Sequence, residues 1–127
     1  MEIIRWADFN SDDRRDLTAF RPGSEFPLLV EGKVIVVKRD GVELGNHSHS
    51  HVEGFLLVSG LCHIVTWTAD GGRASQGIIA PAMFMFEKGE EHVLYCSADT
   101  ILVGYMPVSY KDEHNTPAIH LSCLSDV

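Results

Sequence analysis

The segment GVELGNHSHSHVEGFLLVSG, residues 41–60, carries the pattern that decides the fold. Four potential metal ligands fall within seven of its residues, at His47, His49, His51 and Glu53. Because the side chains of a β-strand alternate between its two faces, these four share one parity and can project to one side. A carboxylate is costly to bury alone, whereas a divalent cation compensates its charge and uses neutral imidazoles as further ligands. The segment therefore predicts a metal site on a strand.

A solvated, histidine-rich loop without a metal is the alternative interpretation of the same residues. The cluster, however, runs directly into the apolar stretch 54–58, which we expect to be buried. Glu53 then stands at the edge of a core strand. This context favours the metal site over the loop.

On both sides of this segment, short runs of β-branched and aromatic residues are separated by turn residues. They predict strands at 32–38, 54–58, 63–68, 76–80, 83–86, 92–97 and 100–107. Asp70-Gly71-Gly72 is the clearest hairpin turn. No helical pattern recurs between the strands, so an all-β sandwich or barrel is expected and not βαβ units.

The two ends of the chain differ in sequence pattern from the strand-rich middle. Ser11-Asp12-Asp13 followed by residues 14–20 is compatible with a cap and one short helix, ended by residues 21–23. Residues 118–121 suggest a last short strand or a dimer arm. We expect one domain over 1–127, with an N-terminal extension (1–24), a barrel (25–107) and a tail (108–127).

The composition of the chain limits the kinds of partner and the cellular compartment that we expect. The chain has 127 residues, of which 45% are hydrophobic, enough for one packed core. With 18 acidic against 10 basic residues the net charge is −8, which disfavours nucleic acid and anionic membranes. The N-terminus lacks a signal peptide pattern, so a cytoplasmic protein is expected. Three widely spaced cysteines predict reduced, buried thiols and neither a disulfide framework nor a Cys-based zinc site.

The histidine segment resembles the first motif of the cupin family. That motif has a glycine, five residues, His-x-His, three or four residues, Glu, six residues and a glycine. Its fixed positions are all matched, by Gly41, His47, His49, Glu53 and Gly60. The resemblance implies an antiparallel barrel of six to eight strands, the double-stranded β-helix or jelly roll.

A second, looser motif of the family is matched in part. Gly89 and His92 agree, while Glu87 stands at the usual proline, Cys96 at the usual asparagine and Pro81 at an earlier glycine. The resemblance implies that His47, His49 and Glu53 lie on one hairpin and that His92 comes from another. Together they would hold one divalent ion, Fe, Mn, Ni or Zn, with one or two positions open for water or substrate.

Three further residues are candidates for catalysis. His51 competes as a ligand by strand parity, but the family spacing makes it a residue that supports the ligands or lines the pocket. Glu87 is either part of a solvated acidic turn or a general base at the barrel mouth. Tyr105 is either ordinary packing or a hydroxyl that faces substrate. The remaining histidines, His63, His114 and His120, are weaker candidates.

The resemblance suggests a metal-dependent enzyme acting on a small polar metabolite, with isomerase or epimerase chemistry on a sugar or hydroxy-carbonyl compound favoured. Segments 46–49, 97–104 and 110–112 look like small cupins that act on sugars and nucleotide-linked sugars. Some of those relatives use histidines without metal, in which case His49 or His51 would be the base and Tyr105 an acid. A mononuclear Fe(II) dioxygenase and a non-catalytic small-molecule binding protein are the alternatives.

A homodimer is expected on physical grounds, because a small open barrel has edge strands to protect. The N-terminal segment and the tail are the candidate dimer elements.

Overall fold

The computed structural model describes residues 7–20, 31–108 and 115–121. Within these ranges the chain is built from strands alone, and none of the described residues forms a helix that could cross a membrane. The strands are β1 (Ala7–Ser11), β2 (Arg15–Phe20), β3 (Glu31–Val37), β4 (Val42–His49), β5 (Glu53–Ser59), β6 (Leu61–Thr68), β7 (Gly72–Ile79), β8 (Ala82–Phe86), β9 (Glu91–Cys96), β10 (Ile101–Met106) and β11 (Asn115–Pro117).

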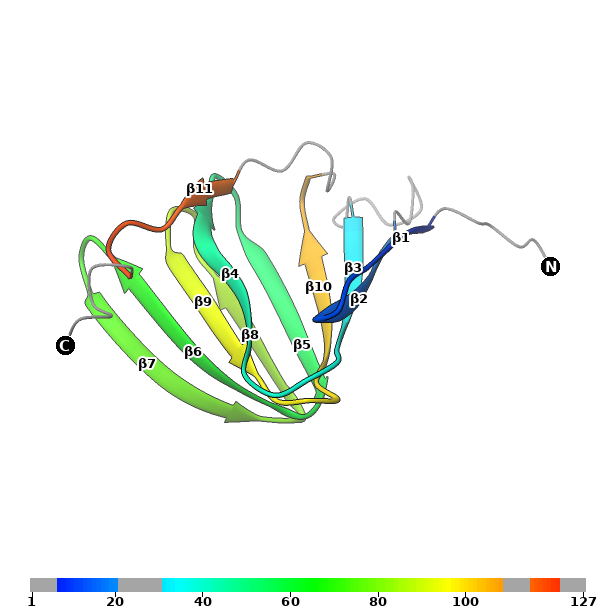
Figure 1. The fold of residues 1–127 in the computed structure, drawn as a ribbon. Helices are drawn as coiled ribbons and strands as arrows, with labels where there is room; N and C mark the ends of the chain where they lie inside the picture. The colour runs from blue at the N-terminus through cyan, green and yellow to red at the C-terminus, as the bar shows by residue number, and fades with distance from the viewer. Residues whose placement is uncertain (1–6, 21–30, 109–114, 122–127) are drawn as a thin grey trace.

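The strands form two antiparallel sheets that face each other (Figure 1). The six-stranded sheet has the order β1-β2-β3-β10-β5-β8, and the five-stranded sheet has the order β11-β4-β9-β6-β7. In Figure 1 the strands of both sheets converge at the bottom of the view and spread apart at the top. The all-β barrel predicted from the sequence is confirmed.

The interior between the sheets follows from strand alternation. Leu57 and Leu102 of the six-stranded sheet are completely buried, and Leu94 of the facing sheet is 3% exposed. Cys62 and Cys96 oppose each other on β6 and β9, with their sulfurs 3.4 Å apart as free thiols. The prediction of reduced, buried thiols is thus correct for these two residues, and Cys123 lies outside the described residues.

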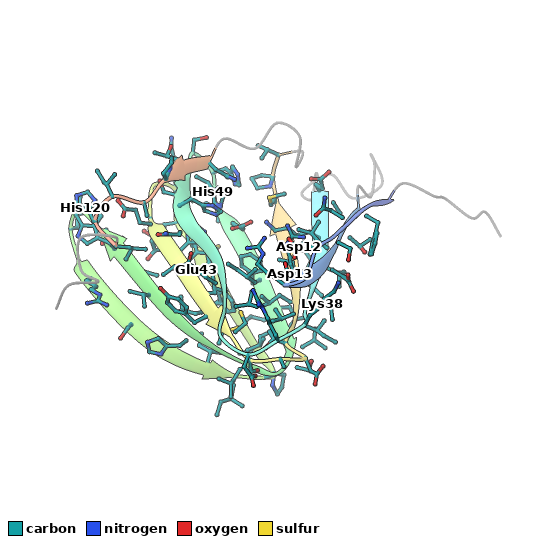
Figure 2. All side chains as sticks on the ribbon, in the orientation of Figure 1. Asp12, Asp13, Lys38, Glu43, His49 and His120 are labelled. Atoms are coloured by element: carbon teal, nitrogen blue, oxygen red, sulfur yellow. The ribbon has the colours of Figure 1, made fainter. Side chains whose placement is uncertain are left out.

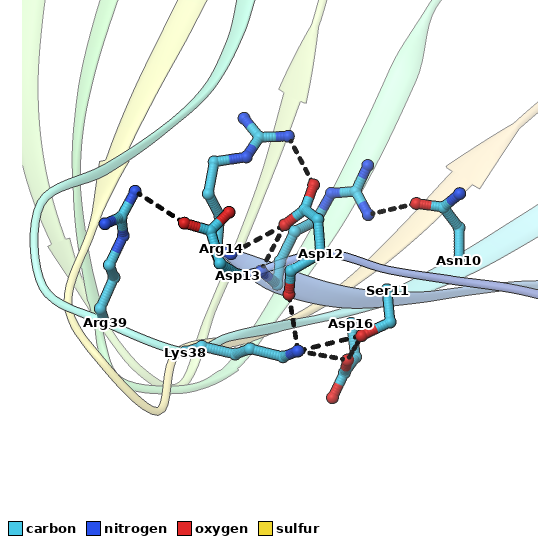
Figure 3. Close-up of polar contacts among 9 residues, drawn as sticks. Asn10, Ser11, Asp12, Asp13, Arg14, Asp16, Lys38 and Arg39 are labelled. Carbon is cyan, nitrogen blue, oxygen red and sulfur yellow. Dashed lines mark hydrogen bonds and ion pairs between the residues drawn. The ribbon is translucent and has the colours of Figure 1, made fainter.

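The helix considered for residues 14–20 is wrong, because this segment forms strand β2. The Asp12 carboxylate accepts the backbone N–H groups of Arg14 and Arg15, at 2.8 and 3.0 Å, and so closes a tight turn between β1 and β2 (Figure 3). The same aspartate pattern serves a helix cap or a turn. Leu17 and Ala19, two residues apart, are both buried, as the period of a strand requires. The Asp12 contacts therefore close a turn before a strand and do not cap a helix.

The last described strand, β11, ends before residues 118–121, where the sequence suggested a strand. Strand β11 pairs with β4, and residues 118–121 leave the sheet in a turn. Ala118 and Leu121 are buried against Val65 and Val93 on the outer face of the five-stranded sheet. Glu91 receives backbone N–H bonds from residues 120 and 121, so these groups are not available for a strand ladder. Tyr110 and His114 lie outside the described residues.

Candidate metal centre

Four of the sequence-predicted side chains meet inside the barrel. His47 and His49 come from β4, Glu53 begins β5, and His92 comes from β9. One potential ligand atom from each lies within 4.8 Å of those of the others. His49, Glu53 and His92 are almost completely buried, and His47 is half-buried. Figure 2 shows His49 near the upper end of the barrel, well away from His120.

A β-bulge in β4 turns the histidines inward. Val42 and Leu44 face the core, so simple alternation would point residue 46 inward and His47 outward. The pairing of β4 with β9 shifts between Gly45 and His47, which places His47 opposite His92. Asn46, the extra residue, has a positive φ of 69°. The bulge therefore reverses the parity of the strand just before its ligands.

The sequence predicts the ligands on one strand or one hairpin, but the structure places them on different strands and in both sheets. Strand β4 belongs to the five-stranded sheet and β5 to the six-stranded sheet, so the chain crosses between sheets at residues 50–52. His51 lies in this crossing and not on a strand face. Glu53 reaches the cluster from the opposite wall of the barrel.

Glu53 is held ionised at the centre of the cluster. Its Oε1 lies 3.0 Å from His49 Nε2 and 3.6 Å from His92 Nε2, and its Oε2 lies 2.8 Å from Lys33 Nζ. Burial raises the pKa of Glu53, but the neighbouring His49 and His92 and the charge of Lys33 outweigh it. The net effect holds the pKa of this carboxyl well below its usual range.

His47 is prepared to act as a neutral ligand, and the ring of His92 is held in place. Burial, together with the neighbouring His92 and His49, lowers the pKa of His47 to about 3. His92 Nδ1 lies 3.0 Å from the Glu90 carbonyl oxygen, which accepts its proton and leaves Nε2 for the cluster. The Phe86 ring lies parallel to the His92 ring, with centroids 4.0 Å apart. These contacts fix the ring's tautomer and orientation, as is usual for metal-binding histidines.

The donor set fits a divalent transition metal ion. Imidazole nitrogens suit zinc, copper, iron and nickel, and one carboxylate oxygen adds a charged ligand that manganese also accepts. Three imidazoles and one carboxylate leave ligand positions open on an octahedral ion. The cluster would thus be an open site on a six-coordinate ion, whereas its four ligands would fill a tetrahedral zinc site.

Lys33 is the site residue that sequence reasoning missed. It is 8% exposed on the inner face of β3, and its ammonium contacts Glu53. A signal was present in the sequence, because Lys33 has the same strand parity as the buried Ile35 and Val37. A lysine in that position of an apolar strand faces the core and needs a partner.

Of the three residues considered for catalysis, His51 contacts a ligand, whereas Tyr105 and Glu87 are exposed. Tyr105 is 37% exposed on β10, between the inward-facing Gly104 and Met106. Glu87 is exposed in the turn after β8, where its backbone N–H donates to the Glu90 carboxylate. His51 is the nearest of the three, since its ring stacks on His49 with centroids 4.8 Å apart.

Two hollows adjoin the cluster. A small cavity of about 50 Å³ lies beside it, lined by Lys33, His47 and His92 and by apolar side chains of both sheets. A larger hollow of about 220 Å³ lies between β6, β7 and β8 and includes Thr66, Gln76 and Phe86. Thr66 pairs with His92 across the sheet, and Phe86 stacks on it, so this hollow also borders the ligands.

No protein-family model and no curated protein matches the chain in sequence. Solved structures do match it. CapF with the inhibitor 3-isopropenyl-tropolone is 21% identical with a TM-score of 0.71, over 89% of this chain and 34% of that one. The capsular polysaccharide assembling protein CapF from Staphylococcus aureus is 18% identical with a TM-score of 0.71, over 92% and 33%.

A third match is the Bacillus subtilis oxalate decarboxylase, in a structure concerned with its Mn(II) centres. It is 10% identical with a TM-score of 0.71, over 86% of this chain and 30% of that one. The chain therefore spans about one third of the length of these proteins. At this level of identity the likeness establishes the fold.

Proposed function

The chain has the cupin fold, and we propose that it is a metal-dependent cupin enzyme acting on a small polar metabolite. We further propose isomerase or epimerase chemistry on a sugar or related hydroxy-carbonyl compound. One observation carries the proposal: four ligand atoms lie within 4.8 Å of one another beside a cavity. Such a cluster of buried titratable groups next to a hollow is the usual mark of an active site.

Manganese or iron is the metal that we propose first. The Mn(II) centres named for the matching oxalate decarboxylase support this choice, although zinc and nickel accept the same ligands. When bound, the ion supplies Lewis-acid polarisation of a carbonyl or hydroxyl oxygen, which acidifies the neighbouring C–H bond. Glu53 and the three histidines hold it, and Lys33 and the Glu90 carbonyl orient two of those ligands.

Proton transfer is assigned to His51. Its Nδ1 lies 2.9 Å from the Val52 carbonyl oxygen, so Nδ1 carries the proton and Nε2 is the basic nitrogen. In an isomerisation this nitrogen would take a proton from the hydroxyl-bearing carbon and return it to the former carbonyl carbon, while the hydroxyl proton passes to the former carbonyl oxygen. In an epimerisation the opposite face would take its proton from water. The outward position of Tyr105 and the exposed turn of Glu87 make both poorer candidates for this role.

The substrate class has independent support from CapF. A tropolone carries a carbonyl and a hydroxyl oxygen on adjacent carbons, and 3-isopropenyl-tropolone is the inhibitor in the CapF structure. The name of CapF itself refers to capsular polysaccharide assembly, which agrees with the proposal of a sugar as substrate. A hydroxy-carbonyl compound would use the same pair of oxygens to occupy two neighbouring positions on a metal ion.

Hydrogen exchange is the direct test of this chemistry. The manganese-loaded protein is incubated in D₂O with a panel of hydroxy-aldehydes, hydroxy-ketones and sugars, and NMR follows deuterium at the carbon next to the carbonyl. The proposal expects exchange with at least one compound, and a His51→Ala variant that keeps its metal should have lost it. Absence of exchange across the panel would contradict isomerase chemistry.

The two alternative functions, a dioxygenase and a non-catalytic binding protein, would give different experimental results. Three imidazoles and a carboxylate also hold Fe(II), with positions open for substrate and O₂. Substrate-dependent O₂ consumption by protein loaded with Fe(II) under anaerobic conditions would therefore identify a dioxygenase. Saturable binding without exchange or O₂ consumption would identify a non-catalytic binding protein.

A further inference from the structure

The inner cavity contains a cation that the metal site does not require as a ligand. Lys33 lines this cavity of about 50 Å³ together with His47 and His92. Its Nζ lies 2.8 Å from Glu53 Oε2 and 5.6 Å from the centre of the Phe55 ring. The other cavity residues on β3, β4 and β10, such as Ile35, Leu44 and Leu102, are apolar.

Stability alone does not account for this lysine. Burying an ammonium group is costly, and a buried ion pair is often replaced by apolar residues with no loss of stability. The inner positions of β3 that follow, Ile35 and Val37, show that the strand accommodates apolar side chains there. A lysine at this place therefore serves the site, where it contacts Glu53 and lines the cavity.

The charges around the cavity favour an anion. A divalent ion brings two positive charges and Lys33 adds one, while Glu53 contributes one negative charge. The loaded site then has two net positive charges in a region of low dielectric, since Glu53 is the only carboxylate among its ligands and the cavity residues. A carboxylate on the substrate would offset one of them.

The size of the cavity limits what fits. One water-sized probe occupies roughly 10–15 Å³, so about four non-hydrogen atoms fill a cavity of this volume. A carboxylate and its neighbouring carbon have that size. Larger parts of a substrate would have to lie toward the hollow lined by Thr66, Gln76 and Phe86.

We propose that Lys33 binds the carboxylate of an α-hydroxy or α-keto acid whose other oxygen reaches the open position of the metal ion. This inference rests on the metal site of the proposed function and narrows its substrate class from hydroxy-carbonyl compounds to small acids. Lys33 is then a binding residue for substrate, in addition to being the partner of Glu53.

The test compares an anion with a neutral compound of the same shape. Glycolate and ethylene glycol both offer two oxygens on adjacent carbons, but only glycolate carries a charge. The full chain is loaded with Mn(II), its metal content is measured, and the binding of each compound is followed by calorimetry and by the Mn(II) EPR spectrum. Wild type is compared with Lys33→Met, Lys33→Gln and Lys33→Arg, and with Lys38→Met as a surface control for the lost charge.

We expect wild type and Lys38→Met to bind glycolate equally, and Lys33→Met and Lys33→Gln to bind it at least about tenfold more weakly. Lys33→Arg should restore most of the affinity, and ethylene glycol should not distinguish the proteins. Equal binding of glycolate by wild type and the neutral variants would overturn the inference, with the metal site intact.

Two further outcomes remain decisive if the neutral variants fold poorly. Wild type that prefers ethylene glycol, or shows no preference for glycolate over it, contradicts the anion site without any variant. Failure of wild type to bind Mn(II) is read from the metal content alone, and it overturns the proposed function and this inference together.

Discussion

Glu53 is the residue on which the site depends, because it contacts two of the three histidines and the buried lysine. Replacing it by Gln should abolish tight metal binding and leave the Lys33 ammonium without its carboxylate. In the metal-free protein we expect a loss of roughly 3–5 kcal/mol in the free energy of unfolding, measured by urea titration. Glu43→Gln, at an exposed position of β4, is the matched control and should change it by less than about 0.5 kcal/mol. A Glu53→Gln variant as stable as this control would contradict the described ion pair.

His47 makes the stability of the metal-free protein depend on pH. Its pKa is lowered from 6.5 to about 3 in the folded chain, so the unfolded chain takes up a proton between these values and the folded chain does not. Stability is therefore retained above the unfolded pKa and lost as the pH falls below it. The depressed pKa of Glu53 acts in the same direction at lower pH. Thermal unfolding between about pH 7 and pH 4 should show a steeper loss for wild type than for His47→Gln. Parallel curves would contradict this assignment.

The outer position of Tyr105 leads to a simple comparison with His51. Tyr105→Phe should keep both metal content and turnover, because the hydroxyl lies on the exposed face of β10. His51→Ala should keep the metal and lose turnover, because the proposed proton transfer depends on its imidazole. Loss of turnover in Tyr105→Phe alone would return the acid role to the tyrosine.

At the scale of elements, the crossings between sheets depend on particular backbone conformations. Gly60 joins β5 to β6 with a φ of 86°, and a Cβ atom there would collide with the side chain of Thr100. Gly60→Ala should cost about 1–2 kcal/mol for the left-handed backbone alone, and more for the collision. Gly77→Ala on β7, where a Cβ meets no atom within 4 Å, is the control. Equal midpoints in urea for the two variants would show that the crossing tolerates a side chain.

The same crossings explain which features of the fold and the site can be predicted from the sequence and which cannot. Strand positions follow from β-branched runs and turn residues, and the ligand spacing follows from a motif matched at every fixed position. The bulge at Asn46 and the change of sheet between His49 and Glu53 do not follow, because both depend on pairing with strands far away in the sequence. Local alternation therefore could not separate His51 from the three residues that gather with His92, and it gave the wrong geometry for His51. It also had no means to place Lys33 beside Glu53.

At the scale of the whole molecule, we propose that the outer face of β3, β10, β5 and β8, four strands of the six-stranded sheet, pairs with a second copy of the chain. The outward positions of β3, β10, β5 and β8 carry no charged residue, although the chain as a whole has a net charge of −8. Val58, Met83 and Met85 are between 47% and 78% exposed on this face. Two such faces are complementary to each other because neither has a charge to desolvate. Residues 118–121, in contrast, pack on their own five-stranded sheet.

Light scattering after size-exclusion chromatography tests this pairing. Wild type should have the mass of a dimer at micromolar concentration, and a Met83→Glu/Met85→Glu variant should have the mass of a monomer. A Glu43→Gln variant, changed on the other sheet, should remain a dimer. A monomeric wild type would contradict the proposal.

The metal content of the purified protein tests the central claim most directly. The chain is prepared without a histidine tag or chelator, exposed in turn to Mn(II), Fe(II), Zn(II) and Ni(II), and analysed for metal by mass spectrometry. Wild type and the Glu87→Gln control should retain about one divalent ion per chain, and the His47→Ala/Glu53→Ala variant should retain almost none. Stoichiometric metal in the double variant, or none in wild type with any of the four ions, would contradict the metal site.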